Sequence, residues 1–248
     1  MLKILFVSAV SACFELQNRE AYYAPEPYTY YLDGERAGRG ETNVFSLFGL
    51  TPGREYRLRL KLDGGGEETL SFQTAGEGCC LDVRDFGAAG DGERDDTAAL
   101  QSAIAFLPPG GRLRFSPGFY RSLPLALKSH ITLDFAPGAV LLASHERERY
   151  PILPGTVRDL DGGAEVHFGT FEGQARAMYA SLLTAQYAED ITILGPGEVD
   201  GNGEVFWRDF LSLPAARPRL LFFNRCRGIR VHGLRVRNSP SWQIHPYY

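Results

Sequence analysis

The chain has 248 residues, 44% of them hydrophobic, with 16 Phe, 12 Tyr and 2 Trp and a net charge of −4. This apolar content excludes an intrinsically disordered chain, and the acidic balance leaves no basic field to attract nucleic acid or anionic lipid. No apolar run approaches the roughly 20 residues of a membrane helix, so no membrane partner is expected. The 28 Gly and 15 Pro favour short strands joined by tight turns, and the length favours two domains of unequal size. An all-β protein is predicted.

The N-terminus permits two interpretations. Lys3 and the apolar residues after it could form a short secretory signal, with Val10-Ser11-Ala12-Cys13 as a lipoprotein cleavage box. The same stretch runs without a break into Phe14-Glu15-Leu16-Gln17, an alternation typical of a strand. We therefore expect a cytoplasmic protein, with secretion or lipid anchoring as the alternative.

The cysteines do not suggest a structural site. Two are adjacent and the others lie far apart, which matches neither a disulfide framework nor the C-x(2–4)-C spacing of a zinc site. Free thiols, no metal site and no cofactor are expected. The four residues are Cys13, Cys79, Cys80 and Cys226.

Residues 1–76 contain short strand candidates with turn signals between them. They are Ile4 to Val7, Ala12 to Gln17, Tyr28 to Leu32, Val44 to Phe48, Tyr56 to Leu62 and Glu68 to Thr74. Asp33-Gly34 and Asp63-Gly64-Gly65-Gly66 supply residues that tolerate positive φ, as hairpin turns require. The pattern predicts an antiparallel β-sandwich, followed by a linker at residues 74–78.

One turn of this domain resembles a known motif. Leu50-Thr51-Pro52-Gly53-Arg54-Glu55-Tyr56 is similar to the tyrosine corner of fibronectin type III domains, in which the Tyr hydroxyl bonds back to the corner backbone. The resemblance implies a fibronectin type III-like domain over residues 1–76. Such a sandwich does not by itself imply a function.

The second domain opens with a glycine-rich loop, Phe86-Gly87-Ala88-Ala89-Gly90-Asp91-Gly92, and one short helix. Residues 98–104 have helical spacing of apolar side chains and would cover the first coil of a solenoid. Asp95 and Asp96 could be read as a catalytic pair. Capping and the helix dipole explain two carboxylates at a helix start more simply.

Three later segments share one frame around Ile131, Ile191 and Ile229. These isoleucines are 60 and 38 residues apart, near multiples of a repeat of about 20 residues. Stacked coils of this length predict a right-handed parallel β-helix over residues 81–248, with six to eight coils before loops are subtracted.

Several motifs in residues 81–248 resemble bacterial polygalacturonases of glycoside hydrolase family 28. Besides the glycine-rich loop, they are Pro117-Gly118-Phe119-Tyr120, Gly195-Pro196-Gly197-Glu198-Val199-Asp200-Gly201-Asn202-Gly203, Arg217-Pro218-Arg219-Leu220-Leu221 and Asn238-Ser239-Pro240-Ser241-Trp242-Gln243-Ile244-His245-Pro246. The resemblance implies a pectin lyase-like β-helix and inverting hydrolysis of α-1,4-galacturonosidic bonds in pectin or polygalacturonate. A fibronectin-like module ahead of the helix looks like the exo-acting branch.

The resemblance also implies where catalysis resides. The family's aspartates belong to an Asn-Thr-Asp stretch and an Asp-Asp pair, supported by Gly-His-Gly and Arg-x-Lys, all on coils after the Ser-Pro-x-Trp-x-x-His-Pro element. That element is followed here only by Tyr247 and Tyr248. We therefore assign no catalytic residue and expect this chain alone to be inactive, because hydrolysis needs both an acid and a base.

Two residues are candidates for substrate binding. Trp242 could stack on a sugar ring, and His245 could hydrogen-bond a sugar hydroxyl or carboxylate. Alternatively, Trp242 packs against the solenoid and His245 only ends a strand. Four arginines would favour a uronate polymer but are more simply explained as surface residues, namely Arg217, Arg219, Arg235 and Arg237.

Two other classes of function stay open: a non-catalytic protein that binds pectin fragments, and a structural β-helix. The last coil is expected to expose apolar side chains and to invite self-association. The residues concerned are Val231, Leu234, Val236 and Ile244.

Overall fold

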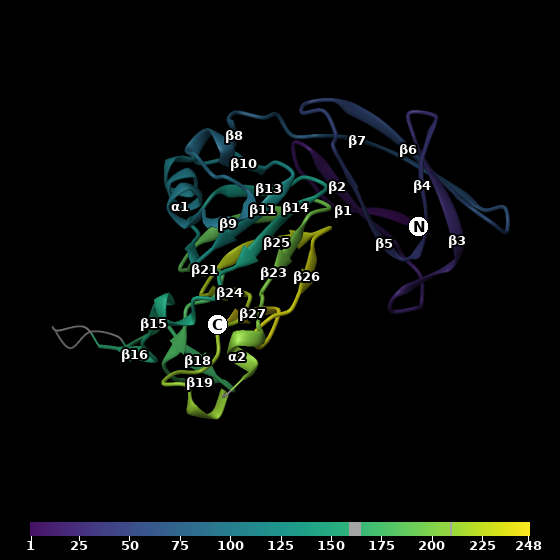
Figure 1. Cartoon of the computed structure of the whole chain (residues 1–248). Coiled ribbons are helices and arrows are strands. Elements are labelled where there is room, and N and C mark those ends of the chain that lie inside the picture. The colour runs from purple at the N-terminus through teal and green to yellow at the C-terminus, as the bar shows by residue number, and fades with distance from the viewer. Residues whose placement is uncertain (159–164, 209) are drawn as a thin grey trace. The chain divides into compact units, whose positions relative to one another are not determined.

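The computed structural model describes residues 1–158, 165–208 and 210–248 (Figure 1). The chain divides into two compact units, Met1–Gly78 and Cys79–Tyr248. Both consist mainly of strands, as the composition predicts. None of the helices in the described part of the chain is long and apolar enough to cross a membrane.

The first unit contains two antiparallel sheets that share one core. One sheet has the order β1 (Leu2–Val7), β2 (Ser11–Leu16), β5 (Val44–Phe48). The other has the order β4 (Glu35–Thr42), β3 (Tyr23–Leu32), β6 (Glu55–Leu62), β7 (Glu67–Gln73). Each of the six predicted strands of this unit coincides with an observed one.

Strand β4 was not predicted, because six of its eight residues are charged or glycine and it shows no apolar alternation. The structure explains its glycines. A Cβ atom at Gly40 would lie 2.6 Å from the hydroxyl of Tyr28, and one at Gly38 would collide with Tyr30. The tyrosine rings of β3 cross this strand, so only glycine leaves room for them.

The turn before β6 contains the hydrogen bond typical of a tyrosine corner. The backbone N–H of Thr51 donates to the hydroxyl of Tyr56 over 2.8 Å. The Tyr56 ring is buried and stacks on Phe72. The corner thus joins the turn to the core of the sandwich.

The second unit is built on three parallel sheets, as predicted for a parallel β-helix. The first sheet stacks β8 (Cys80–Asp82), β10 (Gly111–Phe115), β13 (Ile131–Phe135), β22 (Glu189–Leu194) and β25 (Arg227–His232). The second stacks β9 (Asp91–Asp95), β11 (Gly118–Ser122), β14 (Ala139–Ala143), β23 (Glu198–Asp200) and β26 (Arg235–Arg237). The third stacks β12 (Leu125–Ala126), β21 (Leu183–Gln186), β24 (Leu221–Asn224) and β27 (Ile244–Tyr247).

The predicted isoleucine frame is the register of the first sheet. Ile131 pairs with Ile191, and Ile191 pairs with Ile229. The expected repeat of about 20 residues was wrong for these steps, because the steps of 60 and 38 residues each form one coil and not three or two. Five strands stack in this sheet in the described residues, instead of the expected six to eight coils.

Long insertions account for the difference. Between β14 and β21 lie the short helix η2 (Arg147–Arg149) and three small antiparallel ladders. These pair β15 (Ile152–Leu153) with β20 (Met178–Tyr179), β16 (Thr156–Val157) with β17 (Val166–His167), and β18 (Thr170–Phe171) with β19 (Gln174–Ala175). Between β23 and β24 lie α2 (Glu204–Trp207) and η3 (Phe210–Ser212).

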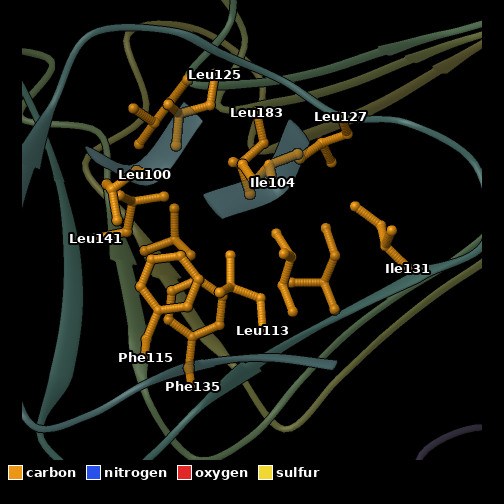
Figure 2. Packing of buried hydrophobic residues seen from close by; sticks show 14 of the residues in the cluster. Leu100, Ile104, Leu113, Phe115, Leu125, Leu127, Ile131, Phe135, Leu141 and Leu183 are labelled. Carbon is orange, nitrogen blue, oxygen red and sulfur yellow. The ribbon is translucent and has the colours of Figure 1, made fainter. Parts of the chain in front are cut away.

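Helix α1 (Thr97–Phe106) covers the first coil, where it contacts η1 (Val83–Phe86), β11 and β12. It buries Leu100, Ala103 and Ile104. Figure 2 shows Leu100 and Ile104 in one packed cluster with Phe115 and Phe135, whose ring centroids are 4.2 Å apart. The helix therefore closes the apolar interior at this end.

The two carboxylates before α1 have separate structural roles. Asp95 accepts a hydrogen bond from the backbone N–H of Thr97 at 3.0 Å and pairs with Arg149 at 2.9 Å. Asp96, although at the N-cap position, makes no side-chain cap and instead accepts from the backbone of the glycine-rich loop, at Ala89 and Gly90. Asp95 therefore binds the first turn of the helix, and Asp96 fixes the glycine-rich loop.

The last coil is less covered than the coils before it. Leu221 is fully buried, whereas its partner Ile244 in β27 is 44% exposed. Val231 is only partly buried, although its partner Ile193 is fully buried. An apolar hollow of about 340 Å³ opens there, lined by Phe223, Cys226, Ile229, Val231, Ile244, Pro246 and Tyr248.

Candidate functional site

The outer face of the third sheet gathers polar and aromatic side chains. Alternate residues of β24 point inward, where Leu221 and Phe223 join the core. The residues between them form rows across the strands, because Phe222 pairs with His245 and Asn224 pairs with Tyr247. We call this surface the outer face.

The insertion between β14 and β21 covers part of the outer face. The side chain of Asn224 donates to the backbone carbonyl of His167, and that of Arg219 donates to the carbonyl of Thr170 over 2.9 Å. These contacts bury Asn224 and Arg219, so the surface is a partly enclosed site rather than an open sheet.

Arg219 is the most unusual residue of the site. It is 1% exposed, and its guanidinium lies 4.9 Å from the centre of the Trp242 ring and 6.0 Å from that of Phe171. Its two hydrogen bonds go to backbone carbonyls, those of Arg217 at 2.6 Å and Thr170 at 2.9 Å. No carboxylate among the described residues forms an ion pair with it.

Trp242 and His245, the two predicted substrate-binding residues, lie beside this arginine. Their rings meet edge to face with centroids 4.6 Å apart, and His245 also contacts the ring of Phe222. Trp242 is 46% exposed, while His245 is 9% exposed. The structure therefore brings both residues and Arg219 into one cluster, with the indole at its surface.

The electrostatics of this cluster favour a neutral histidine next to a cation. Burial lowers the pKa of His245 below its ordinary value, and the positive charge of Arg219 lowers it further. Burial and the neighbouring Arg217 lower the pKa of Arg219 to about 10, so its guanidinium still carries a charge at neutral pH. The cluster has a net positive charge.

Unsatisfied polar atoms concentrate at the same place. Among the described residues, four buried side-chain atoms lack a hydrogen-bond partner, and three of them belong to the outer face and its rim. These three are Nε of Arg219, Oδ1 of Asn224 and Nδ1 of His245. Since buried polar groups are nearly always paired in native proteins, these three atoms are left for a water molecule or another polar partner.

The other arginines singled out in the sequence behave differently. Arg235 and Arg237 pair with Glu198, and Arg237 also pairs with Asp200 at 2.9 Å. Arg217 is partly buried, with its guanidinium 5.1 Å from the ring centre of Phe210. The surface interpretation was therefore wrong for Arg219, which the covering insertion buries.

Asn224 was missed by the sequence reasoning. Its only signal is a polar residue at the end of the apolar run Leu220 to Phe223. The chain turns next to it, since Arg225 has a φ of 52° and Tyr187, one coil earlier, has 53°. The described residues contain no group of three or more His, Cys, Asp and Glu that could hold a metal ion.

The chain is related in sequence to polygalacturonases. It is 32% identical over 172 residues to a probable polygalacturonase from Vitis vinifera, and 30% identical over 169 residues to the exo-poly-alpha-D-galacturonosidase of Dickeya chrysanthemi. These matches cover 66% and 62% of this chain, but only 33% and 26% of those two proteins. The chain thus spans a third or less of the length of these relatives.

The fold is also that of a known enzyme structure. The whole chain matches the family 28 exopolygalacturonase of Yersinia enterocolitica with a TM-score of 0.65, at 20% identity and over 56% of that protein. No family model matches the chain. The polygalacturonase relatives and the parallel β-helix expected from the motifs are both confirmed.

Proposed function

We propose that the chain is a pectin-degrading glycoside hydrolase of the polygalacturonase type, in glycoside hydrolase family 28, with pectin or oligogalacturonate as its substrate. The observation that carries the proposal is the sequence relationship to two polygalacturonases over about two thirds of the chain. The outer face supports it, since it combines a half-exposed indole with hydrogen-bonding groups and a positive charge. Sugars stack on aromatic rings, and uronates carry a negative charge that such a site attracts.

Within this proposal, the 248 residues bind substrate but do not break the glycosidic bond. Trp242 stacks on a sugar ring, and His245 presents its unpaired Nδ1 to a hydroxyl or carboxylate. The Asn-Thr-Asp and Gly-His-Gly stretches of the family do not occur in the sequence. The Asp-Asp pair that is present, Asp95 and Asp96, is used for structure.

We also propose that Met1–Gly78 is a fibronectin type III-like module. Its two antiparallel sheets and the hydrogen bond from Thr51 to Tyr56 support this assignment. The relationship to the exo-poly-alpha-D-galacturonosidase of Dickeya chrysanthemi favours an exo mode of action.

The test measures binding and cleavage separately on the 248-residue chain. Trigalacturonate is titrated into the protein by calorimetry, and reducing ends released from polygalacturonate are counted between about pH 4 and 8. We expect binding without release. Trp242→Ala should weaken binding about fivefold, because an aromatic contact contributes on the order of 1 kcal/mol.

The matched control is Phe119→Ala, which removes an exposed aromatic ring from β11 in the second sheet. This variant should bind as the unchanged chain does. Clean turnover would contradict the assignment of catalysis to residues outside this chain. Absence of binding would contradict the function itself and favour a structural β-helix.

A second candidate function is a non-catalytic protein that binds pectin fragments. The unpaired buried atoms of Arg219, Asn224 and His245 favour it as well, because they can form hydrogen bonds to a sugar without any catalytic role. Both candidates predict binding of trigalacturonate. They differ in what happens when a segment with the family's acid and base motifs is added to the chain. Only the hydrolase should then cleave the substrate.

A further inference from the structure

We propose that Arg219 selects acidic sugars over neutral ones: when Trp242 turns aside, the guanidinium binds the free carboxylate of a uronide. The inference rests on the proposed function and deepens it, because it assigns the charge preference of the site to one residue. A site of this kind would bind free galacturonate units more tightly than their methyl esters.

The first support is the hydrogen-bonding capacity of the guanidinium. An arginine side chain has five N–H donors in a planar fork that matches a carboxylate. Arg219 uses donors only toward the carbonyls of Arg217 and Thr170, and its Nε has no partner although it is buried. An edge of the fork that includes Nε is therefore left for a ligand.

The second support is the uncompensated charge. Other arginines of this unit have carboxylate partners, such as Arg112 with Asp134 at 2.6 Å and Arg230 with Asp190 at 2.8 Å. Arg219 is more buried than either of these arginines, yet it has none among the described residues. A buried charge without a counter-ion is costly, and an anionic ligand removes that cost.

The third support is the cover over the charge. Trp242 lies with its ring 4.9 Å from the guanidinium and is 46% exposed, so the indole covers one part of Arg219 while the insertion with Thr170 and Phe171 covers another. The backbone of Trp242 is held, because its carbonyl accepts from Leu220 N–H at 3.1 Å and from the hydroxyl of Ser239 at 2.8 Å. The rotation that we propose for the side chain therefore requires no shift of the backbone.

The neighbouring groups indicate a sugar acid rather than a simple anion. His245 has an unpaired Nδ1 and Asn224 an unpaired Oδ1, which suit sugar hydroxyls that both donate and accept. The displaced indole offers an apolar surface for the sugar ring. A small inorganic anion would use the charge alone.

The competing explanation is that Arg219 only fixes the β18–β19 hairpin to the coil through Thr170. In that case its removal would loosen the hairpin and weaken every ligand alike. The two explanations differ in one quantity: the ratio of affinities for a charged and an uncharged form of the same sugar.

The experiment measures that ratio with trigalacturonate and its fully methyl-esterified form, in low salt, together with the unfolding midpoint. The variants are Arg219→Gln and Arg219→Met, the latter because an apolar side chain of similar length often replaces a buried charge without loss of stability. Arg235→Gln is the matched control, since it removes the same charge from an exposed position in β26. Trp207→Phe leaves Trp242 as the remaining tryptophan and reports its movement by fluorescence.

We expect the unchanged chain to prefer the acid over the ester by about tenfold or more. Both Arg219 variants should reduce the preference for the acid to within about twofold, while their affinity for the ester stays constant. Arg235→Gln should retain the full preference for the acid. In the Trp207→Phe chain, the acid should change the fluorescence of Trp242 more than the ester does, because both sugars contact the indole but only the acid displaces it. This last measurement does not depend on the folding of an Arg219 variant.

Three results would overturn the inference alone: equal affinity of the unchanged chain for acid and ester, an acid preference kept by the Arg219 variants, or parallel loss of both affinities with a lower unfolding midpoint. An unchanged Trp242 signal on acid binding would also overturn the inference, because the guanidinium is proposed to bind the carboxylate only after the indole turns aside. Failure of the unchanged chain to bind either sugar would refute the proposed function, and the inference with it.

Discussion

Leu221 and Ile244 are partners in the third sheet, yet Leu221 is fully buried and Ile244 is 44% exposed. The two side chains occupy the same place on successive coils. What differs is the layer above them, because β27 ends the sheet in the described residues. The stability of the solenoid should therefore decrease toward this end.

Hydrogen exchange should report this gradient. Backbone amides of β25, β26 and β27 should exchange at least about tenfold faster than those of β13 and β22, because end strands pair on one side only. Mass spectrometry of deuterium uptake at low protein concentration measures this. Equal protection of the two groups of strands would contradict it.

The same end should make the chain self-associate. We expect light scattering to show larger species as concentration rises, because exposed apolar side chains and unpaired strand edges favour association. Ile244→Lys should lower the average mass by placing a charge in the apolar hollow. Phe119→Lys is the control, since Phe119 is exposed away from the hollow, and an equal effect of both variants would disprove this interface.

Stability should depend on pH through two histidines. Burial lowers the pKa of His245, with Arg219 adding to the effect, and burial lowers the pKa of His232. The unfolded chain then binds more protons than the folded chain as the pH falls through about 6.5, so stability is full above that pH and is lost below it.

Urea unfolding at pH 7.5 and pH 5 tests this dependence. His245→Gln should lose less stability over this interval than the unchanged chain, and the remaining slope should include the contribution of His232. His145→Gln is the control, because His145 is exposed. A slope unaffected by His245→Gln would show that its protonation is not linked to folding.

The tyrosine corner should stabilise the first unit measurably. Tyr56→Phe removes the acceptor of the Thr51 N–H and should lower the free energy of unfolding by about 1 to 3 kcal/mol, since that donor loses its partner. Thermal unfolding of this variant is compared with Tyr22→Phe, which changes an exposed tyrosine. Equal midpoints for the two variants would mean that the corner hydrogen bond contributes nothing.

The N-terminal residues should be needed for folding. Deletion of residues 1–12 removes β1 and leaves Phe14 without its partner Ile4, so the first unit should lose protection from proteolysis. We propose a cytoplasmic location, which requires this segment to stay in the protein. N-terminal sequencing of the cellular product that begins at Cys13, or a lipid on that residue, would contradict the location.

The strand register of the solenoid was easier to predict from the sequence than its number of coils. The frame of Ile131, Ile191 and Ile229 could be predicted, because neighbouring coils need the same apolar side chain at the same inward position. The number of coils could not, because insertions add residues without changing that frame. β4 was missed because its glycines make room for the tyrosine rings of β3, and local sequence does not show such a contact between strands.

The candidate site was predictable in part. Trp242 and His245 were found through a motif, and their roles in binding remain proposals. Arg219 was misjudged, because an Arg-Pro-Arg sequence suggests a surface loop, and its burial depends on a hairpin that is distant in the sequence. Residues that a long insertion covers will be hard to recognise from local pattern.

The unequal coil lengths have an evolutionary consequence. Ile131, Ile191 and Ile229 keep their pairing although the loops between them differ by about 20 residues, so loop length and strand register vary independently. A lineage can therefore lengthen, shorten or exchange the loop over the outer face without repacking the interior.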